Sequence, residues 1–250
     1  MAQIRKRDVL NMLFRSFFIQ ASWNSERMIG LGFCFCLIPV ARRLFTDREE
    51  LVNFLNRHLE FFNSHPYMVT YALGAVANIE QQAIQKRWED KRSVGILKTR
   101  IIGPLGAIGD TLFWQLFRPA MGIIGVVLLY SIGVWGALLF FLGYNALHLF
   151  IRIRGLLKSY LKGFDIVRDL SMRGTQKYFR ALKFLFTLLL AVEMLIVTLL
   201  ISNQPHPMQG ALIFIASSIA AYFLTRKRAL SIDIMILLFI FTSFILGLIL

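Results

Sequence analysis

The stretch from Arg57 to Pro66, "RHLEFFNSHP", carries the side chains of this sequence that are best suited to chemistry. It places two histidines, a glutamate, an asparagine and an arginine in a chain that is 57% hydrophobic. Such a group of imidazole, carboxylate and amide side chains can bind a metal ion, hydrogen-bond a polar substrate or face water. The spacing of the residues separates these possibilities only in part.

A metal site fits the spacing poorly. His58 and His65 lie seven residues apart, which is about 10.5 Å along a helix at ~1.5 Å per residue. His58 and Glu60 are two apart and point in different directions on a helix. Two interpretations therefore remain open. Either Glu60 pairs with Arg57 on a solvated face, or amide and carboxylate groups beside a proline break form a substrate site, as in many membrane carriers.

A helix must position this stretch. The segment "TDRE", from Thr46 to Glu49, has the form of a capping box and predicts a helix start. The helix is expected to run toward Ser64 and to end near His65, because the residue before a proline is disfavoured in the α region. The expected apolar face contains Leu51, Leu55, Leu59 and Phe62, flanked by Phe54 and Phe61, and the polar face contains Asn53, Asn56, Arg57, Glu60, Asn63 and Ser64.

A second distinctive segment is "IIGPLGAIGDTLFWQLFRP", residues 101–119, in which Gly103, Gly106 and Gly109 recur at every third position. It lacks the Gly-Lys-Ser/Thr of a P-loop and the G-x-G of a dinucleotide site. One interpretation is a flexible or tight turn with Asp110 as N-cap of a short helix ending near Pro119, whose free amides attract anions or sugar oxygens. The other is that the glycines let helices approach closely.

The composition indicates an integral membrane protein of the all-α class. Only 17% of the residues are charged, against ~25% in ordinary globular domains. Residues 184–225 contain one charge and residues 229–250 contain one, and a spanning helix needs about 20 apolar residues. The basic N-terminus is not followed directly by a long apolar core, so no cleaved signal peptide is expected. We therefore predict about three transmembrane helices in the C-terminal third, over 184–201, 210–225 and 229–250.

Charge placement orients these helices. The net charge is +14, and residues 152–183 hold nine basic residues against two aspartates. Basic segments beside membrane spans are typical of cytoplasmic loops, so this segment is expected inside, "SNQPHPMQ" outside, "RKR" inside and the C-terminus outside. The placement argues against nucleic-acid binding. The basic residues are Arg152, Arg154, Lys158, Lys162, Arg168, Arg173, Lys177, Arg180 and Lys183.

The first 151 residues have a different pattern. Apolar runs at 28–41 and 61–79 are bordered by basic residues at both ends, so we expect re-entrant, interfacial or partner-packed helices there. Residues 119–151 are uncharged but too short for two straight full spans, which predicts a hairpin near 131–136 or a tilted pair. The expected regions are an amphipathic and re-entrant part (1–100), the glycine motif and hairpin (101–151), a basic cytoplasmic segment (152–183) and transmembrane helices (184–250).

Four segments resemble the IID membrane component of the mannose/fructose/sorbose family of bacterial sugar phosphotransferase systems. They are "SWNSERMIGLGFCFCLIP" (22–39), "RHLEFFNSHPY" (57–67), "IGPLGAIGDTLFWQLFRP" (102–119) and "GLLKSYLKGFDIV" (155–167). The resemblance runs in order over residues 11–170. Thr111 and Gln115 stand where the family motif is expected to have proline and glycine, and Ser25 stands where an aromatic residue is usual. The C-terminal region is shorter than in typical members.

The resemblance implies a subunit of a carrier in the bacterial plasma membrane. A IID chain would form the sugar-translocating unit with a IIC subunit, as trimers of such pairs, and a soluble phosphorylated IIB (IIAB) protein would phosphorylate the incoming sugar. This chain would then have no catalytic nucleophile, phosphorylated residue, cofactor or metal. Its basic 152–183 segment would attract an acidic docking partner or lipid headgroups. Cys34 and Cys36 are expected as buried, reduced thiols without a disulfide.

In the light of the resemblance, the polar residues would line or brace the sugar path. Glu60 and Asn63 would hydrogen-bond hydroxyls, and His65 would do the same at the proline break. A buried hydroxyl without a partner costs ~1–3 kcal/mol, so several such groups are needed. Trp23 would offer a ring face with Asn24 beside it, although core packing explains the tryptophan equally well.

Two assignments near this path stay open. Asp110 is either cap or ligand, and Arg27 is an expected interfacial anchor.

Two other function classes compete with the carrier. A membrane enzyme acting on lipid or isoprenoid phosphate would need an acidic metal cluster, whereas Asp47, Asp90 and Asp110 are isolated in the sequence. A non-transporting membrane scaffold of the same fold is the second alternative, and the changes at Thr111 and Gln115 leave it open.

Overall fold

A computed structural model describes residues 3–88, 92–170 and 184, and over these ranges its regular elements are helices. The all-α class is confirmed for this part of the chain. The first elements are α1 (Lys6–Arg15), η1 (Ser16–Phe18), α2 (Gly30–Leu44), α3 (Arg48–His58) and α4 (Val69–Gln85). They are followed by α5 (Arg92–Gly109), η2 (Asp110–Phe117), α6 (Arg118–Ile132), α7 (Val134–Lys162), η3 (Gly163–Asp165) and α8 (Ile166–Asp169). The expected spans after residue 184 lie outside the described residues.

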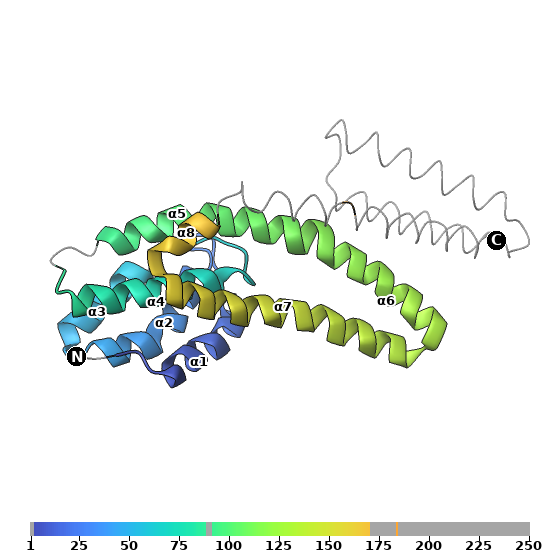
Figure 1. The fold of residues 1–250 in the computed structure, drawn as a ribbon, viewed down its shortest axis with the longest axis horizontal. Helices are drawn as coiled ribbons and strands as arrows, with labels where there is room; N and C mark the ends of the chain where they lie inside the picture. Colours follow the sequence, from blue (N-terminus) through green and yellow to red (C-terminus); the bar gives the residue numbers. More distant parts are fainter. Residues whose placement is uncertain (1–2, 89–91, 171–183, 185–250) are drawn as a thin grey trace, which may run out of the picture. The chain divides into compact units, whose positions relative to one another are not determined.

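Helix α4 is the centre of the helical cluster formed by α1 to α5. It packs along α7 and also contacts α2, α5 and α1 (Figure 1). Contacts on several sides explain why its buried residues cover most of the helix surface. Gly74 lets α7 approach at backbone distance, because a Cβ there would overlap Ser159 and the Leu156 carbonyl. The two helices therefore meet through a small-residue interface.

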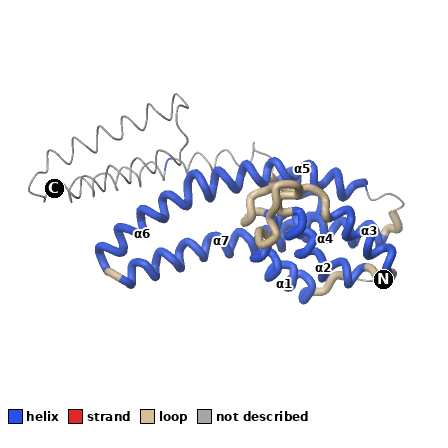
Figure 2. Tube along the Cα trace, turned by 180° about the vertical axis from the view of Figure 1, so that it is seen from behind, coloured by secondary structure: helices blue, strands red, loops and turns tan. Residues whose placement is uncertain are grey.

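Elements α5, η2 and α6 form one continuous helical segment that pairs with α7. The turn between α6 and α7 is at Gly133, where φ is +62°, within the 131–136 segment predicted for it. Figure 2 shows the two arms of this hairpin side by side. Two stretches, Arg92–Leu129 and Val134–Asp169, are long and apolar enough to cross a membrane.

Two expectations about this hairpin need correction. Residues 119–151 were expected to be too short for two full spans, but the helices extend past that run at both ends. The expected region boundary between 151 and 152 falls inside α7. Residues 152–162 are thus the end of a long helix, while 171–183 of the basic segment lie outside the described residues. The re-entrant placement of the 28–41 and 61–79 runs, which form parts of α2 and α4, stays a prediction.

Helix α3 starts one residue later and ends several residues earlier than the sequence predicted. Its N-cap is Asp47, whose carboxylate accepts a hydrogen bond of 3.0 Å from the Glu50 amide, so the box based on Thr46 is wrong. The helix ends at His58, because the following chain pairs with the 27–29 segment. The Ile29 amide donates to the Phe62 carbonyl at 3.1 Å, and Phe62 is fully buried. The polar pattern beyond His58 is therefore not one helical face.

The glycine segment is a helix rather than a turn. Gly103 to Gly109 lie inside α5, and the chain continues without a break into the π-helix η2. Asp110 is consequently not an N-cap, and no free helix amides are present there to attract an anion. Close approach, the other interpretation, holds at Gly109, where a Cβ would overlap the His65 side chain.

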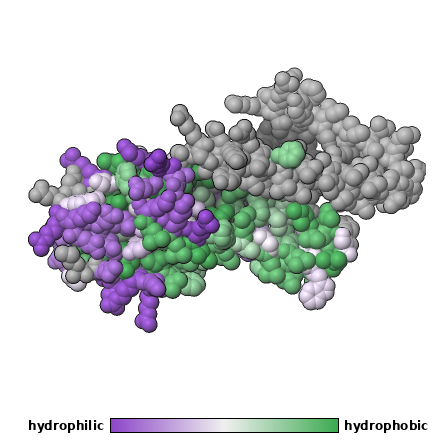
Figure 3. Space-filling view, in the orientation of Figure 1, coloured by the Kyte–Doolittle hydropathy of each residue, from purple (hydrophilic) through white to green (hydrophobic). Residues whose placement is uncertain are grey.

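Polar and apolar surfaces are separated along the described part of the chain. Hydrophilic residues gather over the α1–α5 cluster, and hydrophobic residues cover the α6–α7 hairpin (Figure 3). An apolar surface of this extent needs lipid or a protein partner to cover it. The exposed apolar side chains of the hairpin include Val126, Leu129, Ile132, Val134, Trp135, Leu138, Leu139, Phe141, Leu142, Phe150, Ile153, Leu157 and Leu161.

Candidate functional site

A cavity of about 220 Å³ lies where the extended segment after α3 meets α5, η2 and the loop after η1. It is lined by Gln20, Trp23, Ile29, Asn63, Ser64, His65, Pro66, Gly106, Asp110 and Trp114. The structure thus brings together four residues singled out in the sequence: Trp23, Asn63, His65 and Asp110. Their elements are distant along the chain, and the glycines of α5 allow the approach, since Gly106 and Gly109 face Ser64 and His65.

His65 is buried at the wall of this cavity, with 1% of its surface exposed. Its Nδ1 accepts a hydrogen bond of 3.2 Å from the Tyr67 amide. The neutral ring must therefore carry its proton on Nε2, and Nε2 has no hydrogen-bond partner among the described residues. Burial, with a contribution from the positive charge of Arg152, lowers the pKa of His65 to about 4. His65 is thus a neutral side chain with an unused donor.

Aromatic rings hold His65 in place. Its ring stacks on Phe113 with the centroids 5.0 Å apart, and it lies 4.8 Å from the Trp114 ring. Asn63, Asp110 and Trp23 also line the cavity and are exposed. An amide, a carboxylate, an imidazole donor and indole faces around one cavity suit a small polyhydroxylated ligand, which needs both hydrogen-bonding groups and apolar ring contacts.

Two of the residues singled out in the sequence do not line this cavity. The Glu60 side chain is 64% exposed, and its Oε2 lies 3.1 Å from Lys98 Nζ. Arg57 pairs with Glu80 instead, so the ion pair between Glu60 and Arg57, one of the two interpretations left open, is wrong. Asn24 organises its own loop: its Oδ1 accepts a hydrogen bond of 2.8 Å from the Arg27 amide. The Arg27 guanidinium reaches the Leu59 carbonyl at 3.4 Å.

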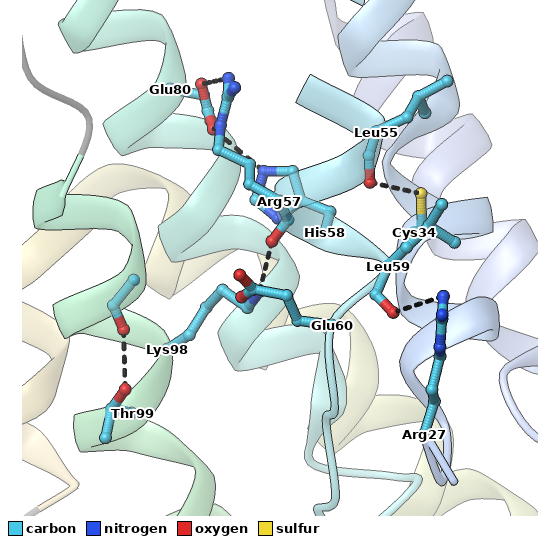
Figure 4. Close-up of polar contacts among 11 residues, drawn as sticks. Arg27, Cys34, Leu55, Arg57, His58, Leu59, Glu60, Glu80, Lys98 and Thr99 are labelled. Atoms are coloured by element: carbon cyan, nitrogen blue, oxygen red, sulfur yellow. Dashed lines mark hydrogen bonds and ion pairs between the residues drawn. The ribbon is translucent and has the colours of Figure 1, made fainter. Parts of the chain in front are cut away.

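A buried ionic network beneath the extended segment was not foreseen from the sequence (Figure 4). The Arg57 guanidinium donates to both oxygens of Glu80, at 2.7 and 2.8 Å, and His58 Nε2 lies 3.0 Å from Glu80 Oε1. Lys98 Nζ donates to the Arg57 carbonyl at 2.7 Å. Both Glu80 and His58 are fully buried. The network joins α3, α4 and α5 directly before the chain enters the cavity wall.

Electrostatics keep this network charged at Glu80 and neutral at His58. Burial alone would raise the pKa of Glu80, but hydrogen bonds from His58 and Arg57 lower it to about 2. Burial lowers the pKa of His58. Because the carboxylate is only an acceptor, His58 donates through Nε2. The available sequence signal was Glu80 itself, a lone acid in a largely apolar helix, which must have a partner when buried.

Comparison with known proteins decides the family. Residues 3–250 match the family model described as the PTS system mannose/fructose/sorbose family IID component. The chain belongs to this family. The resemblance inferred from the four sequence segments is confirmed.

Named relatives of this IID chain are found in several bacteria. It is 36% identical over 176 residues to the PTS system mannose-specific EIID component of Escherichia coli (strain K12), covering 70% of this chain and 62% of that protein. It is 32% identical over 175 residues to the fructose permease IID component of Bacillus subtilis (strain 168), covering 70% and 64%. The aligned region therefore spans somewhat less than two thirds of the length of these relatives.

Solved structures share the fold of this IID chain. A complex of the mannose transporter ManYZ with microcin E492 contains a chain that matches with a TM-score of 0.63 and 27% identity, covering 99% of this chain and 97% of that one. A structure described as a membrane protein matches with a TM-score of 0.80 and 27% identity, covering 98% and 96%. A membrane location agrees with these neighbours and with the two apolar helical stretches.

Proposed function

We propose that this IID chain forms, with a IIC subunit, the sugar-translocating unit of a mannose-type phosphotransferase system. Uptake of a hexose or amino sugar would be coupled to its phosphorylation by a soluble phosphorylated IIB (IIAB) protein. The observation that carries the proposal is the cavity at which Trp23, Asn63, His65 and Asp110 converge. The chain itself supplies binding groups and no phosphorylated residue.

Within the cavity, the ligand contacts divide by chemistry. His65 donates from Nε2, which carries the only N–H proton of the neutral ring, while Asp110 accepts and Asn63 does both. Trp23 and Trp114 offer indole faces to the apolar side of a sugar ring. Asn24 shapes the loop that carries Trp23. Glu60, held by Lys98 but largely exposed, is placed to contact sugar only where a second subunit completes the site.

The membrane arrangement follows from the hairpin and the charge pattern. The proposal places both arms across the bilayer, with Gly133 outside and the basic end of α7 in the cytoplasm, where the IIB protein docks. The apolar surface of the hairpin would contact lipid and the IIC subunit in a trimer of IIC–IID pairs. Neighbouring proteins named as transporter components support a carrier over a scaffold.

The test is sugar binding by the assembled pair. The tagged chain is co-expressed with its candidate IIC partner, and binding of labelled hexoses and amino sugars is measured. Asn63→Ala removes one exposed amide from the cavity and is expected to weaken binding about tenfold, since a lost sugar hydrogen bond costs ~1–2 kcal/mol. Asn53→Ala, an equally exposed asparagine on α3, is the control and should leave the affinity unchanged.

Either of two results would contradict the proposal. A chain that purifies without its IIC partner would contradict the carrier assembly. Co-purification without saturable binding of any sugar would instead favour the scaffold. Equal effects of Asn63→Ala and Asn53→Ala would leave the carrier standing but move the sugar site away from this cavity.

A further inference from the structure

A second cavity, in the α1–α5 cluster, is lined by arginines. It has a volume of about 290 Å³ and lies between α1 and the C-terminal half of α2. Its lining residues are Asp8, Asn11, Arg15, Ile38, Pro39, Arg42 and Arg43. None of these residues lines the sugar cavity, and none is needed for the function proposed above.

The positive charge of this cavity is only partly used within the protein. Arg43 is paired with Asp8, with 3.1 Å between Nε and Oδ2. One N–H group of Arg15 donates to the Phe35 carbonyl at 3.1 Å, and the guanidinium lies over the Phe35 ring. Arg42 makes no hydrogen bond or ion pair with the residues that the structure describes. Since each guanidinium has five N–H donors, most donors around the cavity are free for an anion.

The surface beside this cavity is apolar. Leu10, Phe14 and Phe18 are exposed at 53%, 64% and 63% on the outer side of α1 and η1, and Phe35 is 40% exposed on α2. Two exposed basic residues, Lys6 and Arg7, precede them on α1. A helix with large apolar side chains next to basic ones lies in the interface of a bilayer, with its apolar side chains among the acyl chains.

We propose that this cavity binds the headgroup phosphate of an anionic phospholipid. Arg15 and Arg42 hydrogen-bond the phosphodiester, and Asn11 donates from its amide. Arg43 stays with Asp8, which keeps the aspartate from repelling the phosphate. The acyl chains lie along Leu10, Phe14 and Phe18. The cavity thus selects lipids by the charge of the headgroup, and the phenylalanines distinguish a lipid from free phosphate.

The experiment measures lipid retention by the purified IID chain with its IIC partner, using native mass spectrometry. Phosphatidylglycerol and phosphatidylethanolamine with identical acyl chains are added in turn, and excess inorganic phosphate is added as a competitor. The test variant is R15Q/R42Q, and the matched control is K86Q/R87Q, which removes the same charge from exposed positions after α4, outside the cavity and outside α1. The single variant R42Q removes no contact with the described part of the protein. A loss of lipid in this variant therefore does not reflect misfolding.

Wild type is expected to retain phosphatidylglycerol in preference to phosphatidylethanolamine, and inorganic phosphate should not displace it. Each arginine near an anionic headgroup contributes about fivefold in affinity, so R15Q/R42Q should lose about 25-fold and R42Q about fivefold. K86Q/R87Q should stay within about twofold if the contacts are specific. Equal losses in both double variants, or no preference between the lipids, would overturn the proposal. Displacement by inorganic phosphate would show a small-anion site and would also overturn it.

Discussion

The Glu80 carboxylate joins three helices at one buried point. It accepts from Arg57 and His58 of α3, and Lys98 of α5 reaches the same turn of α3 through the Arg57 carbonyl. A buried charge that loses its partners costs far more than the pair contributes when it is intact. The network therefore constrains how α3 can sit on α4, and with it the entry of the chain into the sugar cavity.

Replacing this carboxylate should destabilise the fold strongly. Glu80→Gln leaves Arg57 and His58 without their anion, and breaking a buried pair costs about 3–5 kcal/mol. For a chain of this size the melting temperature should fall by about 6–20 °C. Thermal unfolding of the purified chain measures the shift. Glu26→Gln, which removes a solvent-exposed ion pair with Arg27, should change stability by less than ~1 kcal/mol. Similar shifts in the two variants would contradict a special role for Glu80.

The histidines and Glu80 predict a loss of stability in acid. The pKa values of His58 and His65 are lowered from the ordinary 6.5, so their contribution is present above pH 6.5 and is lost as the pH falls below it. Glu80 contributes above its ordinary pKa of 4.5, and its part is lost between pH 4.5 and about 2. Melting temperatures should thus be level from pH 8 to 6.5 and decline below.

A variant isolates one histidine in this profile. His65→Gln removes the imidazole that is held neutral down to pH about 4 and should make the decline between pH 6.5 and 4 shallower than in wild type. His206 lies outside the described residues, and His206→Gln serves as the control for removing a histidine. An unchanged slope in His65→Gln would show that His65 does not remain neutral in the fold.

At the scale of elements, the glycines of α5 have different roles despite their regular spacing. A Cβ at Gly109 would overlap the His65 ring, whereas a Cβ at Gly103 would meet nothing within 4 Å. Gly109→Ala should therefore destabilise by about 1–3 kcal/mol through overpacking and weaken sugar binding. Gly103→Ala should be neutral or stabilise by up to about 1 kcal/mol, because alanine favours the helix. Equal effects on melting temperature would contradict the close approach.

A second pair of glycines tests the packing of α4 on α7. Gly74 faces Ser159 and the Leu156 carbonyl, whereas a Cβ added at Gly122 on α6 would meet no atom within 4 Å. Gly74→Ala must move backbone against backbone, so a loss of about 1–3 kcal/mol is expected, with Gly122→Ala as the neutral control. A melting curve of Gly74→Ala identical to wild type would mean that α7 can shift away at no cost.

Sequence patterns predicted where helices occur better than they predicted the residues at which the helices begin and end. The apolar run at 119–151 predicts a hairpin, but the charged ends of its helices hide their full length. The end of α3 depends on backbone pairing of Phe62 with Ile29, a contact between segments distant in sequence that periodicity cannot reveal. Lys98, which binds the Glu60 carboxylate, was hidden for the same reason. Trp23, Asn63, His65 and Asp110 were selected as candidates through the family motifs. Their spacing in the sequence did not indicate that they would line one cavity.

At the scale of the whole molecule, the hairpin predicts sidedness. Helix α7 has 29 residues, about 43 Å at ~1.5 Å per residue, against a hydrocarbon core of about 30 Å. Its basic end should therefore project into the cytoplasm. In a Cys34→Ala/Cys36→Ala background, Trp135→Cys should react with an impermeant thiol reagent on intact cells, and Lys162→Cys only after permeabilisation. The reverse pattern would invert the topology, and labelling of both on intact cells would exclude a spanning hairpin.

The π-helix η2 has an implication for how this family can vary. A wide turn of this kind amounts to an extra residue inside an otherwise regular helix. It separates the register of α5, which contributes Gly106 to the cavity, from that of α6, whose exposed surface is apolar. Deleting one residue from Asp110–Phe117 would rotate everything beyond it by about 100°. Thr111 and Gln115, which stand where the sequence analysis expected proline and glycine in the family's glycine motif, lie inside this element. Neither of these two residues lines the cavity, so substitutions at Thr111 and Gln115 can change the angle between the two surfaces while the cavity lining stays the same.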